Sequence, residues 1–243
     1  MALILIPILT GGTSCSDEGL KSVVSTEVAT DQISAKHWIY RLGDGHLEAT
    51  SRLRITWECP EGSGCLLDTP FLELVEPDRL SLVSGTVTVS FEPVVEDGIR
   101  LVYEAETPSS TDATSVRVVL ERATGPVEFT ADFPEPFEIL SPAEGSTFSR
   151  QEGFQMEVSR ELTYVYIWGE CIEDWQRVSW TLGTLYDFPA GPFDAAEGYE
   201  GESCDVTIQA YRSQDGVIDP AVDPDTSSIE ASQKRVVQVT LSP

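Results

Sequence analysis

Hydrophobic and polar residues alternate along much of this chain, and the alternation predicts β-strands. Successive side chains of a strand point to opposite faces, so a period of two produces a sheet with one buried and one solvated face. The alternation is clearest in the segments that begin at Leu53, Val87, Val127, Phe154, Val206 and Val237. The sequence after residue 15 contains no sustained helical period. The pattern therefore predicts an all-β protein made of antiparallel sheets.

Turn-forming residues separate the predicted strands. Asp97-Gly98 lies between two apolar runs, and this dipeptide is a strong signal for a β-hairpin. Thr124-Gly125-Pro126 separates two further strands, and Asp215-Gly216 ends another. Many short strands with turns at regular spacing are typical of β-sandwiches.

The segment Phe133-Pro134-Glu135-Pro136-Phe137 marks a boundary between two halves of the chain. Its prolines interrupt strand pairing and favour an extended linker. Each half keeps about a hundred residues, which is the size of one sandwich domain. We therefore expect two tandem antiparallel β-sandwich domains, at residues 36–133 and 137–243, with a flexible tether at 16–35 before them.

The start of the second half has a recognisable motif. Residues 137–148 read Phe-Glu-Ile-Leu-Ser-Pro-Ala-Glu-Gly-Ser-Thr-Phe, which resembles the first strands of bacterial Ig-like modules with the pattern I-x-S-P-x-x-G-x-x-F. The resemblance implies an Ig-like sandwich over roughly the last hundred residues and implies no particular function. It also implies that Trp168 packs on a Cys171–Cys204 bridge. The first half lacks the motif, so its sandwich subtype stays open.

An apolar run, Met1–Leu9, lies near the start of the sequence. It is shorter than the about 20 residues that span a bilayer and fits the core of a secretory signal. Small and polar residues separate it from Cys15. The arrangement resembles the signal and lipobox of a bacterial lipoprotein, although Gly12 stands where leucine is usual and no basic residue precedes Lys21. Ordinary secretion and a cytosolic protein are the alternatives.

The lipoprotein resemblance has three implications for the chain. Residues 1–15 would be a signal peptide that ends at the lipobox cysteine. Cys15 would be lipidated, so that the membrane is a partner through an acyl anchor. Ser16 follows the cysteine where Asp would favour the inner membrane, so an exported protein at the outer membrane or cell surface is expected.

The cysteines agree with export. The chain has 5 Cys, and an even set remains when Cys15 is set aside. Even numbers favour disulfides, which persist in oxidising compartments. Cys59 and Cys65 bracket a turn-rich loop, and Cys171 and Cys204 flank an irregular region. Zinc is the competing explanation, and the absence of a Cys-x-x-Cys pair argues against it.

The net charge of the chain limits the classes of partner that we expect it to bind. The sequence has 41 acidic and 15 basic residues, which gives a formal net charge of -26. Such a surface repels nucleic acid and anionic lipid, so nucleic acid is not an expected partner and an acyl chain suits membrane attachment better than a basic patch. Solubility alone would explain the charge, and cation binding is the alternative.

Two groups of residues are candidate ligand sites. Carboxylates are preferred calcium ligands, and one acidic loop offers Asp215, Asp219, Asp223 and Asp225 as a calcium site with a spacing unlike that of an EF-hand. Exposed aromatic rings can stack on sugars, which makes Trp175 and Tyr199 candidates for glycan binding.

The sequence contains no recognisable catalytic motif. His37 and His46 are the 2 histidines of the chain, and we expect both in surface loops without a catalytic setting. The resulting expectation is a cell-envelope lipoprotein that acts as a non-enzymatic structural, adhesion or protein-binding module, with an envelope or extracellular protein as its partner. A carbohydrate- or calcium-binding surface module is the first alternative, and a hydrolase that uses acidic residues is the second.

Overall fold

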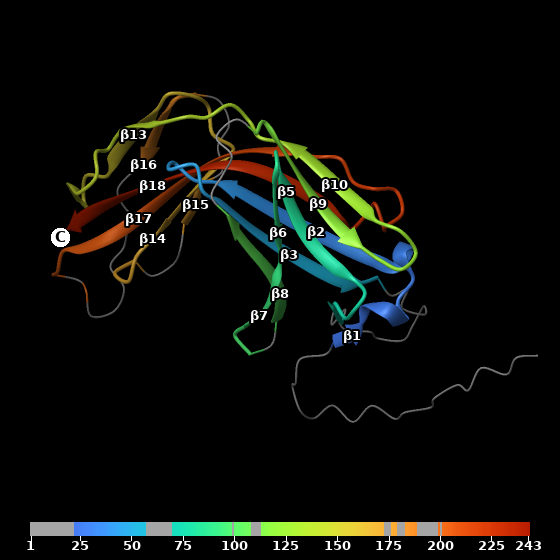
Figure 1. Ribbon diagram of the computed structural model, residues 1–243. Coiled ribbons are helices and arrows are strands. Elements are labelled where there is room, and N and C mark those ends of the chain that lie inside the picture. The colour runs from blue at the N-terminus through green and yellow to red at the C-terminus, as the bar shows by residue number, and fades with distance from the viewer. Residues whose placement is uncertain are drawn as a thin grey trace, which may run out of the picture.

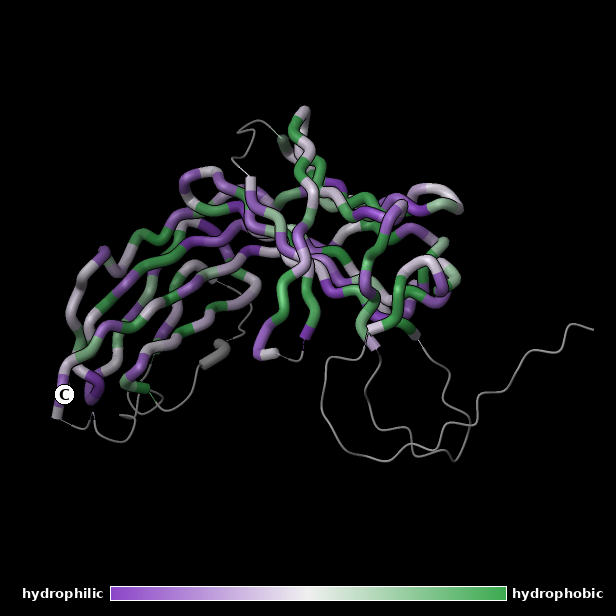
Figure 2. The backbone as a smooth tube through the Cα atoms, turned by 60° about the horizontal axis from the view of Figure 1, so that its bottom comes forward, coloured by the Kyte–Doolittle hydropathy of each residue, from purple (hydrophilic) through white to green (hydrophobic). Residues whose placement is uncertain are grey.

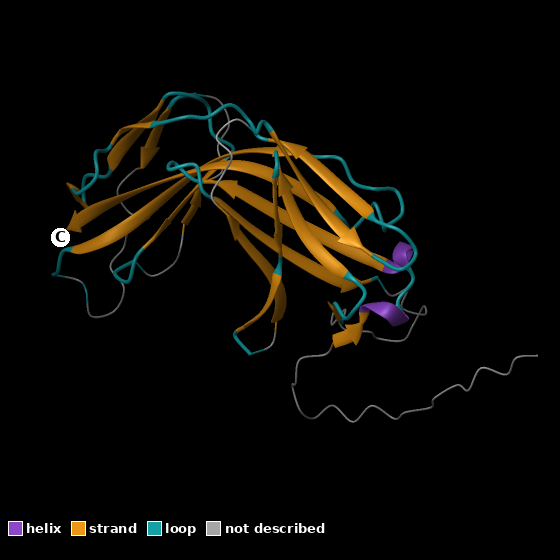
Figure 3. Ribbon diagram, viewed as in Figure 1, coloured by secondary structure: helices purple, strands orange, loops and turns teal. Residues whose placement is uncertain are grey.

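The computed structural model describes residues 22–56, 70–98, 100–107, 113–172, 176–178, 183–188, 199 and 201–243. In these ranges the regular structure is β-strand, except for two short 3-10 helices at Ser25–Glu27 and Thr30–Gln32 (Figure 3). The expected all-β class is therefore confirmed. No helix in the described ranges is long and apolar enough to cross a membrane.

The strands form three sheets. The first, which we call the long sheet, contains β1 (Ser22–Val24), β2 (Ile33–Arg41), β3 (Leu47–Ile55), β4 (Phe71–Glu73), β7 (Glu92–Glu96), β8 (Arg100–Thr107), β12 (Ser146–Ser149), β14 (Tyr164–Trp168), β15 (Gln176–Val178), β17 (Cys204–Asp215) and β18 (Ser228–Ser242). The second sheet contains β5 (Arg79–Ser84), β6 (Val87–Ser90), β9 (Ser115–Glu121) and β10 (Val127–Asp132). The third sheet contains β11 (Ile139–Ser141), β13 (Phe154–Val158) and β16 (Leu185–Phe188).

The hairpin of β17 and β18 lies in the middle of the long sheet and joins its two parts. These strands pair without interruption from Cys204–Leu241 to Asp215–Glu230. On its other side β18 pairs in parallel with β2 through residues 228–233, and then with β12 through residues 239–242. One continuous strand therefore belongs to both halves of the molecule.

The second and third sheets pack on the same face of the long sheet. Ile229 and Ala231 of β18 lie in the first core, and Val237 and Val239 lie in the second. These positions differ by even numbers, so their side chains share one face of the strand. In Figure 1 the third sheet lies above the long one at the left, and the second sheet overlaps the long one. Figure 2 brings the opposite side forward, with hydrophobic and hydrophilic residues alternating along the strands. We call this opposite side the outer face.

The expected division into domains at 36–133 and 137–243 matches the packing only in part. Phe133 lies in the first core and Phe137 in the second, so the chain passes between the cores at the double-proline segment. However, Val222 and Ile229 from the end of the chain complete the first core. The shared hairpin returns through the first half, so the two sandwiches are not a simple tandem pair.

The flexible tether expected at residues 16–35 is wrong for residues 22–35. β1 pairs with β4, and Ile33 at the start of β2 is fully buried. The buried side chain of Arg122 holds this segment, because its guanidinium donates to the carbonyls of Ser25 (2.6 Å) and Val28 (2.7 Å). Asp78 pairs with the same guanidinium at 3.1 Å. Residues 16–21 lie outside the described residues.

The turn residues act as the sequence predicts. β7 and β8 form a hairpin around Asp97 and Gly98, whose φ angles are 52° and 72°. Positive φ at both central residues is the type I′ geometry that Asp-Gly favours. β17 ends at Asp215, directly before Gly216.

Candidate functional site

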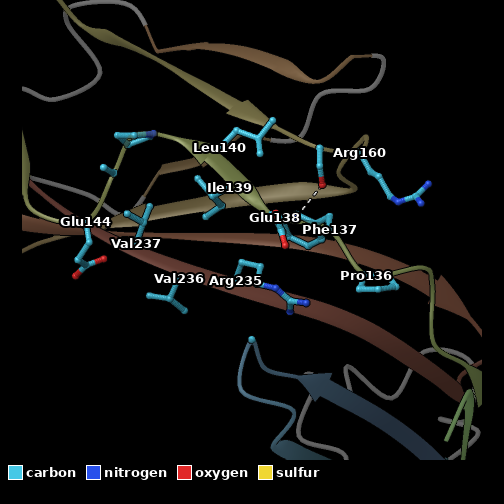
Figure 4. Close-up of a pocket in the computed structure, with 14 residues that line it drawn as sticks. Pro136, Phe137, Glu138, Ile139, Leu140, Glu144, Arg160, Arg235, Val236 and Val237 are labelled. Carbon is cyan, nitrogen blue, oxygen red and sulfur yellow. Dashed lines mark hydrogen bonds between the residues drawn. The ribbon is translucent and has the colours of Figure 1, made fainter. Parts of the chain in front are cut away.

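A groove lies where β18 passes from the first core to the second, and we call it the junction groove. Its volume is about 1000 Å³. One wall is formed by the residues from Pro136 to Glu144, and the other by β18 with the turn between β2 and β3. Figure 4 shows Ile139 and Leu140 on the β11 side, and Arg235 and Val236 along β18.

The junction groove exposes apolar side chains on regular strands. Leu140 of β11 is 53% exposed, and Val236 of β18 is 48% exposed. Single exposed apolar residues are common on protein surfaces, but two that line one groove form a surface suited to an apolar partner.

The groove also contains an unpaired stretch of strand edge. The amide of Gln238 donates to Glu144 Oε2 (3.0 Å), and its carbonyl accepts from the amide of Gly145 (2.8 Å). These groups therefore point away from β17. Antiparallel pairing alternates residue by residue, so the N–H and C=O of Val236 point to the same side as those of Gln238. Among the described strands, none pairs with β18 on this side between Gln233 and Val239.

Two arginines, Arg160 and Arg235, line the groove together with two glutamates, Glu138 and Glu144. The guanidinium of Arg235 lies 5.4 Å from the ring centre of Phe137 and donates to the carbonyl of Lys234 (2.8 Å). Burial lowers the pKa of Arg235, and the carboxylate of Glu138 opposes this shift. Arg160 pairs with Glu135 at 2.6 Å. The charges that line the groove are therefore mixed, and a guanidinium among them can pair at short range with an acidic side chain of a partner.

A second hollow lies on the outer face, and we call it the tryptophan pocket. It has a volume of about 630 Å³. Its lining consists of Trp168, Gly169, Glu170, Tyr199, Cys204, Asp205 and Thr207. Tyr199, a candidate stacking residue from the sequence, therefore lines this pocket with the exposed Trp168, but it is half-buried against the second core. The other candidate, Trp175, lies outside the described residues.

Trp168 does not occupy the core position that the Ig-like resemblance implied. It is 38% exposed at the end of β14, whereas Val165 and Ile167 of the same strand are fully buried. The alternation along β14 places Trp168 on the outer face with Tyr164 and Tyr166. This alternation is visible in the sequence and could have identified Trp168 as a residue of the outer face.

The tryptophan pocket has a rigid frame. Cys171 and Cys204 form a disulfide with Cα atoms 6.1 Å apart, which confirms one expected bridge. The buried guanidinium of Arg150 donates to the carbonyls of Tyr199 (3.4 Å) and Glu202 (3.3 Å). Gly169 lies against β17, since a Cβ at this position would come within 2.6 Å of the Val206 side chain.

The other predicted cysteine sites cannot be placed. Cys15, Cys59 and Cys65 lie outside the described residues.

The aspartates proposed as a calcium site do not assemble into one. The carboxylate of Asp219 accepts from the amides of Glu128 (3.0 Å) and Ala221 (2.9 Å). The carboxylate of Asp223 accepts from the backbone amide of Asp225 (3.0 Å) and from the hydroxyl of Thr226 (2.9 Å). Their carboxylates thus cap turns of the acidic loop. In the described ranges no three acidic, histidine or cysteine side chains, Asp215 and Asp225 included, are grouped to hold a metal ion.

The expectation of two surface histidines is wrong for His37. It is 1% exposed, its Nδ1 lies 2.7 Å from the hydroxyl oxygen of Ser51, and its ring centre is 4.4 Å from that of Phe129. Burial lowers the pKa of His37 to about 3. The inward face of β2 includes position 37, so the side chain is enclosed in the first core. This Ser–His pair is closed to any substrate.

His46 remains near the surface, in the turn between β2 and β3. Its Nε2 lies 3.6 Å from Glu106 Oε1.

The comparisons with known proteins show no family for this chain. No family model matches it, and no curated protein matches it significantly.

Several solved structures align with low scores. The titin domains Z1Z2 in complex with telethonin have 11% identity and a TM-score of 0.24, covering 87% of this chain and 99% of that one. The fibronectin(III)-like modules of Clostridium thermocellum CbhA have 10% identity and a TM-score of 0.21, covering 85% and 94%. Bacteroides ovatus SGBP-B, in complex with a mixed-linkage heptasaccharide, has 13% identity and a TM-score of 0.22, covering 98% and 69%. At these scores the likeness carries no argument about function.

Proposed function

We propose that this protein is a non-enzymatic binding module of the bacterial cell envelope, and that it captures an extended segment of another envelope or extracellular protein in the junction groove. The observation that carries the proposal is the unpaired edge of β18 at Val236, in a groove that Leu140 also lines.

The chemistry of the groove suits β-strand addition. In this mode an extended peptide pairs with an open sheet edge, where main-chain hydrogen bonds give affinity and side-chain contacts give specificity. The N–H and C=O of Val236 are directed toward the incoming strand. Leu140 and Val236 would contact its apolar side chains, and Arg235 would attract an acidic one.

The groove is rigid before binding, which favours affinity. β18 is fixed by β17 on one side and by β2 and β12 at the two ends of the gap. The opposite wall is held by the amide of Glu138, which donates to Ser159 Oγ at 2.8 Å (Figure 4). A preformed site loses less conformational entropy when a partner binds.

Lipidation of Cys15 would determine where this groove acts. Six residues separate Cys15 from Ser22, where β1 begins, and a fully extended chain over these seven steps spans at most about 25 Å. An acyl chain on Cys15 would therefore hold the sandwiches close to the membrane surface. This geometry suits capture of a partner that lies at or in the same membrane.

Substitution of Val236 tests the binding mode. A photo-crosslinking residue at Leu140 in the full-length protein, expressed in its own bacterium, should give one discrete adduct. Val236→Pro removes the N–H that points into the groove and should abolish the adduct, whereas Val236→Ala keeps the N–H and should retain it.

A crosslinking residue at Val217, which is 69% exposed and far from the groove in sequence, is the positional control. An adduct of equal yield from Val217, or one that survives Val236→Pro in a folded protein, would contradict strand addition.

The anchor has a separate test. Cells that are fed an alkyne fatty acid should label the wild-type protein, and Cys15→Ser should remove the label and release the protein from the membrane fraction. Labelling that persists in Cys15→Ser would refute this anchor without affecting the groove.

A further inference from the structure

We infer that the outer face carries a second binding site, for a neutral oligosaccharide, which is centred on the tryptophan pocket. This inference is independent of the junction groove, because it uses different residues and a different class of ligand.

Aromatic rings form a continuous strip on the outer face. Tyr211 of β17 has its ring centre 4.7 Å from Tyr164, 5.8 Å from Tyr166 and 5.6 Å from Tyr40. Tyr164 and Tyr166 lie 5.3 Å apart, and Trp168 follows on the same strand. We call Tyr40, Tyr211, Tyr164, Tyr166 and Trp168 the aromatic strip.

The two ends of the aromatic strip differ in exposure. Tyr164 and Tyr211 are buried by their neighbours, and burial raises the pKa of both hydroxyls. Trp168 at the other end is exposed and lines the tryptophan pocket. The buried rings thus fix the strip in place, while Trp168 offers an indole face to a ligand.

The spacing of the exposed end suits a chain of sugar rings. Residues two apart on a strand are separated by about 6.6 Å. Tyr166 is half-buried and Trp168 lines the tryptophan pocket, so the two rings are placed to contact neighbouring pyranose units, whose C–H faces stack on aromatic rings. Quaternary ammonium ligands are typically held in cages of several rings, whereas these rings follow one another along a strand.

Polar groups border the indole face. Thr207 of β17 lies opposite Trp168 in the strand register. Asp205 also lines the pocket, and its Oδ1 accepts from the Thr240 hydroxyl at 2.7 Å, which fixes the carboxylate and leaves Oδ2 for a sugar hydroxyl. The carboxylates of Asp205 and Glu170 repel acidic sugars, so the ligand is a neutral glycan.

The frame of the pocket is preorganised for such a weakly held ligand. The Cys171–Cys204 disulfide joins the segment after β14 to the start of β17, and Arg150 holds the segment from Tyr199 to Glu202. A hydrogen-bonding site for sugar hydroxyls requires fixed acceptors, because loosely held ones must be ordered when the ligand binds.

Affinity electrophoresis of the full-length protein tests the inference. Gels contain a panel of neutral polysaccharides, namely glucans, mannans, xylans and galactans, and a parallel gel contains the acidic polymer alginate. We expect retardation by at least one neutral polymer and none by alginate. Trp168→Ala should weaken that binding by about tenfold, and Asp205→Asn should weaken it as well.

Two control variants distinguish a failure of this sugar site from a failure of the proposed junction groove. Leu185→Ala changes another exposed apolar residue, and Val236→Pro disables the junction groove; both should bind the polysaccharide like the wild type. Circular dichroism and a non-reducing gel establish that Trp168→Ala is folded with its disulfide intact. No retardation by any neutral polymer, binding unchanged in folded Trp168→Ala, or retention only on an immobilised quaternary-ammonium ligand would each overturn the inference.

Discussion

At the residue scale, the main surprises are polar side chains inside the first core. His37 and Arg122 are both buried, yet their environments differ. Arg122 has a carboxylate and two carbonyls around its guanidinium, whereas His37 Nε2 has no hydrogen-bond partner among the described residues. A buried imidazole without such compensation is stable only as the neutral form.

The burial of His37 predicts a loss of stability in acid. Its pKa is lowered to about 3 in the folded protein and is about 6.5 in an unfolded chain. Between these values the unfolded chain binds a proton that the folded protein does not. The free energy of unfolding should therefore decrease as the pH falls below 6.5, by about 2 kcal/mol at pH 5 from this group.

Urea unfolding at pH 7 and pH 5 measures this contribution. His37→Leu removes the titrating group, so the variant should lose about 2 kcal/mol less than the wild type between the two pH values. His46→Leu removes the surface histidine and should follow the wild type. Equal losses in His37→Leu and the wild type would show that His37 does not titrate as its burial implies.

At the element scale, the alternation of residues predicted the strands but not their full lengths. The last strand was expected at Arg235–Leu241, whereas β18 begins at Ser228. The inward positions between the two cores hold Gln233 and Arg235, and these polar residues interrupt the hydrophobic period. Gln233 donates to the carbonyl of Pro134 (3.0 Å), and Arg235 packs on Phe137. The period fails where the strand leaves one core and enters the next.

The candidate sites were harder to predict than the strands. Trp168 was assigned to the core because of the Ig-like resemblance, although its position directly after the buried Ile167 on β14 places it with the outward set. Neither the junction groove nor the aromatic strip follows from local pattern, because each joins segments that are distant in the chain. The pairing of β18 with β2 and then β12 decides both the gap and its position.

The close packing around Gly216 predicts that a larger residue at this position lowers the stability of the protein. Its amide donates to the carbonyl of Ile229 (2.9 Å), and Val217 pairs with Thr130 of β10. An added Cβ at Gly216 would lie 2.6 Å from the Cβ of Ala131 and closer still to the Thr130 carbonyl oxygen. Gly216→Ala should therefore destabilise the protein by about 1–3 kcal/mol.

The matched control for this substitution is Gly201→Ala. A Cβ at Gly201 meets no other atom within 4 Å, so this variant should stay within about 0.5 kcal/mol of the wild type. Urea unfolding of both variants at neutral pH gives the comparison. Equal stability of the two variants would mean that the turn after Asp215 can move away from β10 without cost.

At the scale of the whole molecule, the shared hairpin should make the two sandwiches unfold as one unit. β18 has 15 residues and contributes side chains to both cores, with no turn between the two contributions. The linker is also held against the hairpin, because Arg212 donates to the carbonyl of Glu135 at 2.7 Å. Unfolding of either core would remove one side of the strand on which the other depends.

Phe129→Ala tests this coupling. Phe129 is fully buried in the first core, and its truncation should cost about 3–5 kcal/mol. Calorimetry should show one transition at a lower temperature, and hydrogen exchange should accelerate in β13 of the second core as much as in β9 of the first. Independent tandem domains would behave differently, because the variant would then show two transitions and exchange in β13 would keep its wild-type rate.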